Sequence, residues 1–218
     1  GNHPALNFVL QSEQLGTGHA LLQAESLFRD RRGSVVVLSG DVPLIRSETL
    51  RRLVETHEQM EAAATVLTTR MDCPLGYGRI IRNGTRLGRI VEERDASKEQ
   101  RQLKEINGGI YAFTLPPLFD ALRKIPAACG INEIYLPELV TIYGRLGLPV
   151  ETVAVKNPEE VRGINSQTEL AEVRQIVRNN KNEEQQQTSQ QTKDETSKRK
   201  YKQTNEQTNK QANKQYLQ

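Results

Sequence analysis

The segment SVVVLSGD, residues 34–41, joins a run of β-branched residues to a polar end. A continuous apolar run of this length is typical of a strand that is buried on both faces of a sheet. Its polar end, Ser39-Gly40-Asp41, places a carboxylate at the carboxyl end of that strand, where open α/β sheets bind ligands. Two interpretations follow for Asp41: a ligand of Mg²⁺ on nucleotide phosphates, or a residue that caps the turn before Pro43.

Strand and helix patterns alternate on both sides of this segment. The predicted strands span residues 6–10, 34–38, 62–69, 106–113 and 150–155, and the predicted helices span residues 19–29, 47–58, 118–124, 136–145 and 168–178. Ser47 is the predicted N-cap of its helix, and Asn83-Gly84 predicts a hairpin between strands at 78–82 and 87–92. This alternation predicts the α/β class, with a Rossmann-like, mixed but mostly parallel sheet flanked by helices.

The net charge of the chain lies in its last 40 residues. Residues 179–218 hold 8 Lys or Arg against 5 Asp or Glu, whereas residues 1–178 hold 22 of each sign. A charge of +3 placed there is poor support for nucleic-acid binding. The segment also contains 10 Gln and ends in the repeats QTNE, QTNK and QANK. We therefore predict one domain at 1–178 and a disordered low-complexity tail at 179–218. Our hypothesis for the origin of the tail is a short tandem repeat in the coding DNA or a frame-shifted end of the gene.

Cysteine, histidine and apolar patterns narrow the functional classes. Cys73 and Cys129 form no CxxC pair, which favours a reduced, cytoplasmic compartment over a disulfide framework. No apolar run approaches the roughly 18 residues of a membrane span, and no signal-peptide pattern opens the chain, although a first residue other than Met suggests that the natural start precedes it. His3, His19 and His57 have no spacing typical of a metal site or a triad, so direct displacement aided by metal and positioning is the remaining reaction type.

A second polar segment, QSEQLGTGHA at residues 11–20, precedes a predicted helix. Gln11 and Gln14 carry donors and acceptors suited to a base edge. Gly16-Thr17-Gly18 opens the helix, whose first N–H groups attract anions. The residues alone leave two interpretations open, a nucleotide-binding loop and a plain turn with a Thr cap.

Four further residues are candidates for a ligand-binding site. Gly78 follows Gly76 before the predicted hairpin, which indicates either close approach of the backbone or a bulge. Glu92 and Asn107 lie at strand ends and are suited to sugar hydroxyls and amides, although each is also typical of a surface charge or a turn. Asn165, in RGIN, is compatible with an N-cap or a metal ligand.

All of these segments occur together in one family. In order they are VLQSEQLGTGHA, GDVPLI followed by SETL, PLGYGRIIRNG, RIVEERDASKEQ, EINGGIYAF, NEIYLPELV and VRGIN. From Asn7 to Glu172 the chain resembles the uridylyltransferase domain of the bifunctional bacterial enzymes that make UDP-N-acetylglucosamine. The resemblance implies a nucleotide-diphospho-sugar transferase fold, UTP and N-acetylglucosamine-1-phosphate as substrates, UDP-N-acetylglucosamine as product and Mg²⁺ as cofactor. It implies no nucleic-acid or membrane partner, and it is compatible with a homo-oligomer of the full-length enzyme.

The resemblance also implies a role for each matched residue. Gln11 and Gly16 match uracil-reading positions, and Thr17 matches a neighbouring contact in the nucleotide pocket. Ser39, where the family also has Tyr, and Gly40 lie beside the substrate. Gly78, Glu92 and Asn107 match positions that hold the N-acetylglucosamine moiety. Asp41 and Asn165 match the protein ligands of Mg²⁺.

Two parts of the family pattern are missing from residues 1–218. One is a first strand with a Gly-rich loop of the form LAAGxGTRM…PK, which cradles the triphosphate, and the other is a C-terminal left-handed β-helix that carries an acetyltransferase. We therefore expect the chain as given to bind UTP weakly and to turn over little. Competing interpretations are another sugar-1-phosphate or molybdenum-cofactor nucleotidyltransferase, and a catalytically inactive fragment that binds sugar nucleotide.

Overall fold

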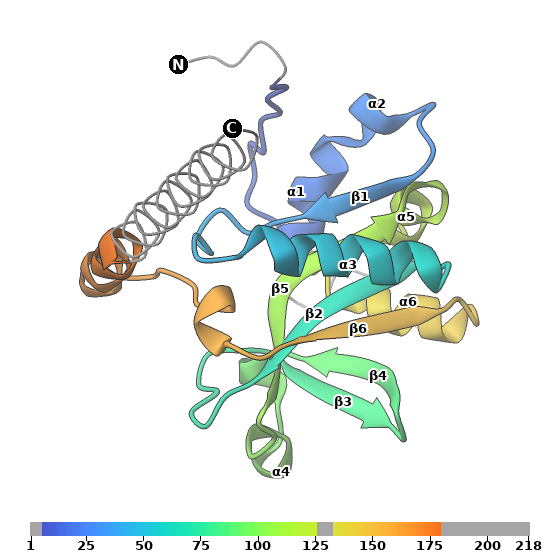
Figure 1. The fold of residues 1–218 in the computed structure, drawn as a ribbon. Helices are drawn as coiled ribbons and strands as arrows, with labels where there is room; N and C mark the ends of the chain where they lie inside the picture. The colour runs from blue at the N-terminus through green and yellow to red at the C-terminus, as the bar shows by residue number, and fades with distance from the viewer. Residues whose placement is uncertain (1–5, 126–132, 180–218) are drawn as a thin grey trace, which may run out of the picture. The chain divides into compact units, whose positions relative to one another are not determined.

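The computed structural model describes residues 6–125 and 133–179 (Figure 1). The chain divides into two compact units, residues 1–163 and 164–218. The first unit contains the sheet. The second contains a helix that starts at residue 167 and includes residue 179, the last one described. The tail predicted at 179–218 lies outside the described residues except for residue 179, and so do His3 and Cys129.

The sheet of the first unit has six strands of mixed direction. They are β1 (Ser34–Val37), β2 (Ala64–Arg70), β3 (Arg79–Asn83), β4 (Arg86–Val91), β5 (Glu105–Thr114) and β6 (Val150–Val155). The order is β4-β3-β5-β2-β6, and β1 pairs with β5 off this path. β5 is antiparallel to β1, β2 and β3, whereas β2 and β6 are parallel neighbours. Four strands, β1, β2, β3 and β6, therefore point the same way, and β4 and β5 are reversed.

Helices cover both faces of this sheet (Figure 1). α3 (Ser47–Gln59) lies on one face, and α5 (Leu115–Leu122) and α6 (Glu138–Arg145) lie on the other. The short helices are α1 (Thr17–Gln23), α2 (Glu25–Phe28), η1 (Glu93–Asp95), α4 (Lys98–Arg101) and η2 (Pro158–Val161). No helix in the described part of the chain is both long and apolar enough to cross a bilayer.

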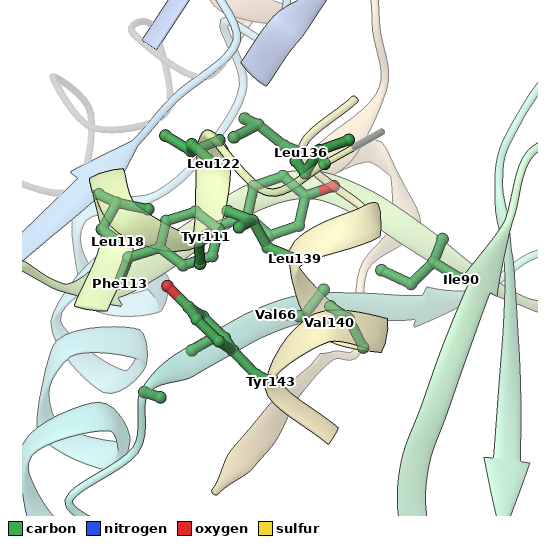
Figure 2. Close-up of a cluster of buried hydrophobic side chains, with 14 of the residues drawn as sticks. Val66, Ile90, Tyr111, Phe113, Leu118, Leu122, Leu136, Leu139, Val140 and Tyr143 are labelled. Atoms are coloured by element: carbon green, nitrogen blue, oxygen red, sulfur yellow. The ribbon is translucent and has the colours of Figure 1, made fainter. Parts of the chain in front are cut away.

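The alternation of side chains along β5 separates two hydrophobic clusters. Ile110 packs on the α3 side with Leu53, and Tyr111 and Phe113 pack on the α5 and α6 side, because successive residues of a strand face opposite ways. Figure 2 shows the second cluster, in which the Tyr111 and Phe113 rings stack with centroids 5.5 Å apart. Tyr143 of α6 meets Phe113 edge-on at 6.4 Å.

The mixed sheet flanked by helices is confirmed, and β1, α3 and β2 follow one another as predicted. However, β5 inserts between β1 and β2, so these two strands are parallel without being neighbours. The β3–β4 hairpin is also confirmed. Its loop is Gly84-Thr85 rather than Asn83-Gly84, because Asn83 pairs with Arg86.

Four local predictions were wrong. β1 is not buried on both faces, since Ser34 is exposed and the three valines that follow are only half-buried. Residues 6–10 form no strand; their side chains are exposed and no described strand pairs with them, so the sheet offers no partner for their backbone groups. The helix predicted at 19–29 is two short helices, α1 and α2, which meet at Ala24. Arg46 occupies the N-cap position of α3, and the Ser47 hydroxyl instead donates to the Glu48 carboxylate at 3.2 Å.

Candidate functional site

Three separately predicted residues, Gly78, Glu92 and Asn107, lie together where β3, β4 and β5 meet. The backbone N–H of Asn107 donates to the Gly78 carbonyl at 2.9 Å. A Cβ on Gly78 would lie 3.2 Å from Oε1 of Glu92, so a glycine leaves room beside the carboxylate. Ser39 joins the group because its hydroxyl donates to the Gly109 carbonyl at 3.4 Å. Residues from distant parts of the sequence thus form one polar cluster.

Two hydrogen bonds fix the side-chain amide of Asn107. The Gly109 N–H donates to Oδ1 at 3.1 Å, and Nδ2 donates to the Tyr111 hydroxyl at 2.6 Å. A backbone N–H can only donate, so the amide oxygen must face Gly109 and the amide nitrogen must face Tyr111. One amide hydrogen and one oxygen lone pair remain. The side chain can therefore donate to a ligand and accept from it.

A bulge in β5 brings Asn107 and Tyr111 into contact. Val66 pairs with Tyr111 and Thr68 pairs with Asn107, so three residues of β5 lie opposite one residue of β2. In a regular strand, residues four apart are separated by about 13 Å. The bulge contains Gly109 with φ +71°, which shortens this path. The sequence motifs did not single out Tyr111 and predicted no bulge here; the paired glycines Gly108 and Gly109 inside the strand are the signal that could have indicated one.

Glu92 is a half-buried carboxylate with a raised pKa. Burial raises the pKa above its ordinary 4.5, Arg94 lowers it, and Asp95 and Glu138 raise it. No residue in 6–125 or 133–179 donates a hydrogen bond to this carboxylate. It lines a pocket of about 320 Å³ together with Tyr135 and Glu138, where it could accept hydrogen bonds from a ligand. Two larger pockets, of about 500 and 670 Å³, contain none of the predicted site residues.

The Gly16-Thr17-Gly18 loop packs its backbone against residues 134–136. The Gly18 N–H donates to the Ile134 carbonyl at 2.7 Å, and the Leu136 N–H donates to the Thr17 hydroxyl at 3.1 Å. A Cβ on Gly16 would lie 2.5 Å from the Ile134 oxygen. The residue at the N-cap position of α1 is Gly16, so Thr17 is not the cap considered from the sequence. The close backbone contact accounts for both glycines.

Gln11 borders the same loop. Its Nε2 donates to the Gly16 carbonyl at 3.2 Å and lies 3.0 Å from Nδ1 of His19. Gln23 places its own Nε2 3.1 Å from the other ring nitrogen of His19. A neutral imidazole has one acceptor nitrogen, so only one of the two amides can donate to it. The Oε1 of Gln11 has no hydrogen bond with any described residue and is open to a ligand.

Asp41 and Asn165 are both exposed and lie in different units of the chain. No described residue pairs with the Asp41 carboxylate, which follows Gly40 in the turn after β1. In the second unit, Ser166 caps the helix because the Glu169 N–H donates to its hydroxyl at 3.2 Å. The N-cap alternative for Asn165 was therefore wrong. Within the described ranges, no three His, Cys, Asp or Glu residues are grouped as metal ligands.

Known proteins resemble this chain over most of its length. The nucleotidyl transferase family pattern matches residues 2–126. The bifunctional protein GlmU of Syntrophotalea carbinolica is 45% identical over 178 residues, which cover 82% of this chain and 38% of that protein. The bifunctional protein GlmU of Pelotomaculum thermopropionicum is 49% identical over 171 residues, with coverage of 78% and 37%. The chain thus spans under two fifths of the length of these two curated relatives.

A solved structure supports the fold. The crystal structure of UDP-glucose pyrophosphorylase complexed with UDP-glucose matches with a TM-score of 0.50 and 18% identity, over 65% of this chain and 55% of that one. The family pattern covers more than half of the chain and includes the cluster of Ser39, Gly78, Glu92 and Asn107. The chain therefore belongs to the nucleotidyl transferase family.

Proposed function

We propose that the chain carries the sugar- and base-binding part of an enzyme that transfers a uridylyl group from UTP to N-acetylglucosamine-1-phosphate. The products are UDP-N-acetylglucosamine and pyrophosphate. The observation that carries this proposal is the cluster in which the Glu92 carboxylate and the oriented Asn107 amide flank Gly78. The motifs shared with the uridylyltransferase domains, and the membership of the nucleotidyl transferase family, support it.

The sugar would be recognised by the two polar side chains of this cluster. Glu92 would accept hydrogen bonds from ring hydroxyls. These bonds would offset the cost of burying a carboxylate that has no hydrogen-bond donor among the described residues. Asn107 would use its remaining amide hydrogen and lone pair on the acetamido group, which offers one acceptor and one donor. A sugar without the acetamido group would leave the remaining amide hydrogen and oxygen lone pair of Asn107 without these partners, and it would bind more weakly.

The base would be read at the loop that begins with Gln11. The open Oε1 of Gln11 would accept from the ring N–H of uracil, a donor that cytosine lacks at that position. Gly16 and Thr17 would border the base. Ser39 and Gly40 would lie beside the nucleotide, and a Cβ on Gly40 would have nothing within 4 Å, so the backbone there is open to a ligand.

The reaction would be an in-line displacement at phosphorus. An oxygen of the sugar 1-phosphate forms a bond to the α-phosphorus of UTP, the bond to the β-phosphate oxygen breaks, and pyrophosphate leaves. The phosphate nucleophile is already ionised, so no general base is needed. The chain's own residues bind and orient the two substrates, which is the main contribution to catalysis in phosphoryl-type transfer.

Asp41 and Asn165 are each proposed, taken singly, as a protein ligand of Mg²⁺. Their donor set fits the ion, because each is exposed and offers a side-chain oxygen, and neither is used as a helix cap. Mg²⁺ typically takes only one or two protein ligands and completes its shell with water and substrate phosphates. When bound, the ion would offset the negative charge that the phosphates carry during the transfer.

Calorimetry with UDP-N-acetylglucosamine and UDP-glucose, with and without Mg²⁺, tests the proposal on this chain. We expect UDP-N-acetylglucosamine to bind more tightly, Asn107→Ala to reduce that preference, and Asp41→Ala to remove the Mg²⁺ dependence. Asp30→Ala, the same change at another exposed Asp, is the control and should alter neither. Absence of binding, or equal affinity for the two sugar nucleotides, would contradict the proposal.

A further inference from the structure

The hydroxyl of Tyr111 lies between the hydrophobic core and the polar cluster. Tyr111 is 3% exposed, and its ring stacks on Phe113 with an interplanar angle of 17°. Figure 2 shows the hydroxyl oxygen at the end of the ring that points away from Phe113. The ring is thus held by core packing, and only its hydroxyl reaches the Asn107 amide, at 2.6 Å.

The direction of this hydrogen bond follows from the backbone. The Gly109 N–H occupies Oδ1 of Asn107, so Nδ2 faces Tyr111 and the Tyr111 oxygen accepts. Burial raises the pKa of Tyr111 above its ordinary 10.0, so the phenol stays neutral at physiological pH. The contact between Asn107 and Tyr111 is therefore a hydrogen bond between two neutral groups. The Gly109 N–H sets the orientation of the Asn107 amide, and core packing sets the position of the Tyr111 ring.

Without the hydroxyl, one end of the Asn107 amide would be free. The Gly109 N–H alone would hold Oδ1, and rotation about the last side-chain bond would be limited only by packing. Asn107 is 9% exposed, so its amide nitrogen would also lack a partner in a place that water reaches poorly. Both effects would make the amide less well oriented for a ligand.

We infer that Tyr111 is a positioning residue of the sugar site: its hydroxyl holds the Asn107 amide in the orientation that recognises the acetamido sugar. The inference rests on the proposed function for the identity of the ligand. The orientation of the amide itself does not depend on any ligand. Tyr111 acts through Asn107 and is not a catalytic residue.

Tyr111→Phe removes the hydroxyl and keeps the ring that stacks on Phe113. The hydrophobic cluster that contains Tyr111 also provides a matched control, Tyr143→Phe. Tyr143 is buried against the same Phe113 ring, and its hydroxyl has no partner among the described residues. The side-chain amide signals of Asn107 in a ¹⁵N–¹H spectrum are measured without ligand. Affinity for N-acetylglucosamine-1-phosphate is measured by calorimetry on both variants and on each combined with Asn107→Ala.

We expect Tyr111→Phe to shift the Asn107 amide signals, to speed their exchange with solvent and to weaken sugar-phosphate binding roughly 3- to 10-fold. Tyr143→Phe should leave both readouts unchanged, and Tyr111→Phe should cause no further loss in an Asn107→Ala background. Unchanged Asn107 signals in Tyr111→Phe would overturn the inference, as would equal losses of affinity in both Tyr→Phe variants. Failure of the unaltered chain to bind the sugar phosphate would contradict the proposed function, and the ligand-free signals would still decide the role of Tyr111.

Discussion

Glu92 shows how a single residue can serve a site at the expense of the fold. Burial is the largest cause of its raised pKa. A carboxyl whose pKa is higher in the folded state than in the unfolded state reduces stability as the pH rises through the unfolded value, here near 4.5. The loss starts at the unfolded pKa and is complete above the folded one. The opposite holds for Glu105, whose pKa is lowered chiefly by hydrogen bonds from Arg82, at 2.6 and 2.8 Å.

We therefore expect Glu92→Gln to raise the melting temperature at pH 7 and to weaken binding of N-acetylglucosamine-1-phosphate. The gain in stability should shrink on acidification and vanish below about pH 4, where the native carboxyl is protonated in both states. Glu105→Gln is the matched comparison and should lower the melting temperature, because it breaks the pair with Arg82. A lower melting temperature for Glu92→Gln would show that its carboxylate stabilises the fold and is not held ready for a ligand.

Sequence reasoning identified most of the polar cluster and missed its support. Ser39, Gly78, Glu92 and Asn107 were found because they lie in motifs, and the structure brings these four together. Their contacts could not be predicted, because they depend on which strands become neighbours. Tyr111 was assigned only to a strand, because a tyrosine in an apolar run does not indicate which group its hydroxyl contacts.

At the scale of elements, the start of α1 and the segment before α6 depend on each other. Residues 15–18 and 134–136 exchange backbone hydrogen bonds, and Thr17 adds its side chain. Gly16 has a φ of +96°, and a Cβ at this position would lie 2.5 Å from the Ile134 oxygen, so any side chain is strained there. Gly18 has no positive φ, and a Cβ there would lie 2.8 Å from Cγ2 of Ile134 and 3.0 Å from the Ile134 oxygen.

Gly16→Ala should therefore destabilise the protein by about 1–3 kcal/mol. Gly18→Ala should destabilise it by less, because the Gly18 backbone is not in the left-handed region and the backbone oxygen is farther from its Cβ position, at 3.0 Å. Gly144→Ala is the control, since Gly144 is a helical residue of α6 with nothing within 4 Å of its Cβ position. That substitution should stabilise by about 0.5–1 kcal/mol. Chemical denaturation measures all three variants. A Gly16→Ala variant as stable as the parent would mean that the contact with Ile134 is loose.

Most element boundaries could be predicted, and two of the errors arose where the backbone or the side chain had no expected partner. The apolar pattern of residues 6–10 predicted a strand, but a strand forms only where a neighbouring backbone pairs with it, and none of the described strands does. The Ser47 side chain prefers the adjacent Glu48 carboxylate to the helix backbone. Composition alone could not reveal either outcome.

At the scale of the whole molecule, the reversed strand β5 organises the first unit. β2 runs along one edge of β5, while β1 and β3 pair with opposite ends of its other edge. β5 also contributes Asn107 to the polar cluster and Tyr111 to its support. Sequence periodicity identifies β5 as a strand, but it contains no signal for direction or for pairing partners far along the chain. The sheet order therefore had to come from the structure.

His57 joins α3 to this sheet. It is 1% exposed, with Nδ1 3.0 Å from the Thr65 hydroxyl on β2 and Nε2 3.1 Å from the Thr114 hydroxyl at the end of β5. The Thr114 hydroxyl donates to the Ala62 carbonyl at 2.7 Å, so it must accept from His57. Nε2 therefore carries the proton, and Nδ1 accepts from Thr65. This arrangement requires a neutral imidazole.

Global stability should consequently fall as the pH drops below the ordinary histidine pKa of 6.5. Burial lowers the pKa of His57, with Glu58 opposing the shift, so the unfolded chain takes up a proton before the folded chain does, and acid favours unfolding. Urea denaturation at about pH 7.5 and about pH 5.5 measures the loss. His57→Gln can still bond to both threonines without titrating, so it should lose less stability between these two pH values, even if it is less stable than the parent at the higher one. An equal loss in parent and variant would show that other groups cause the acid sensitivity and that His57 keeps its partners when it is charged.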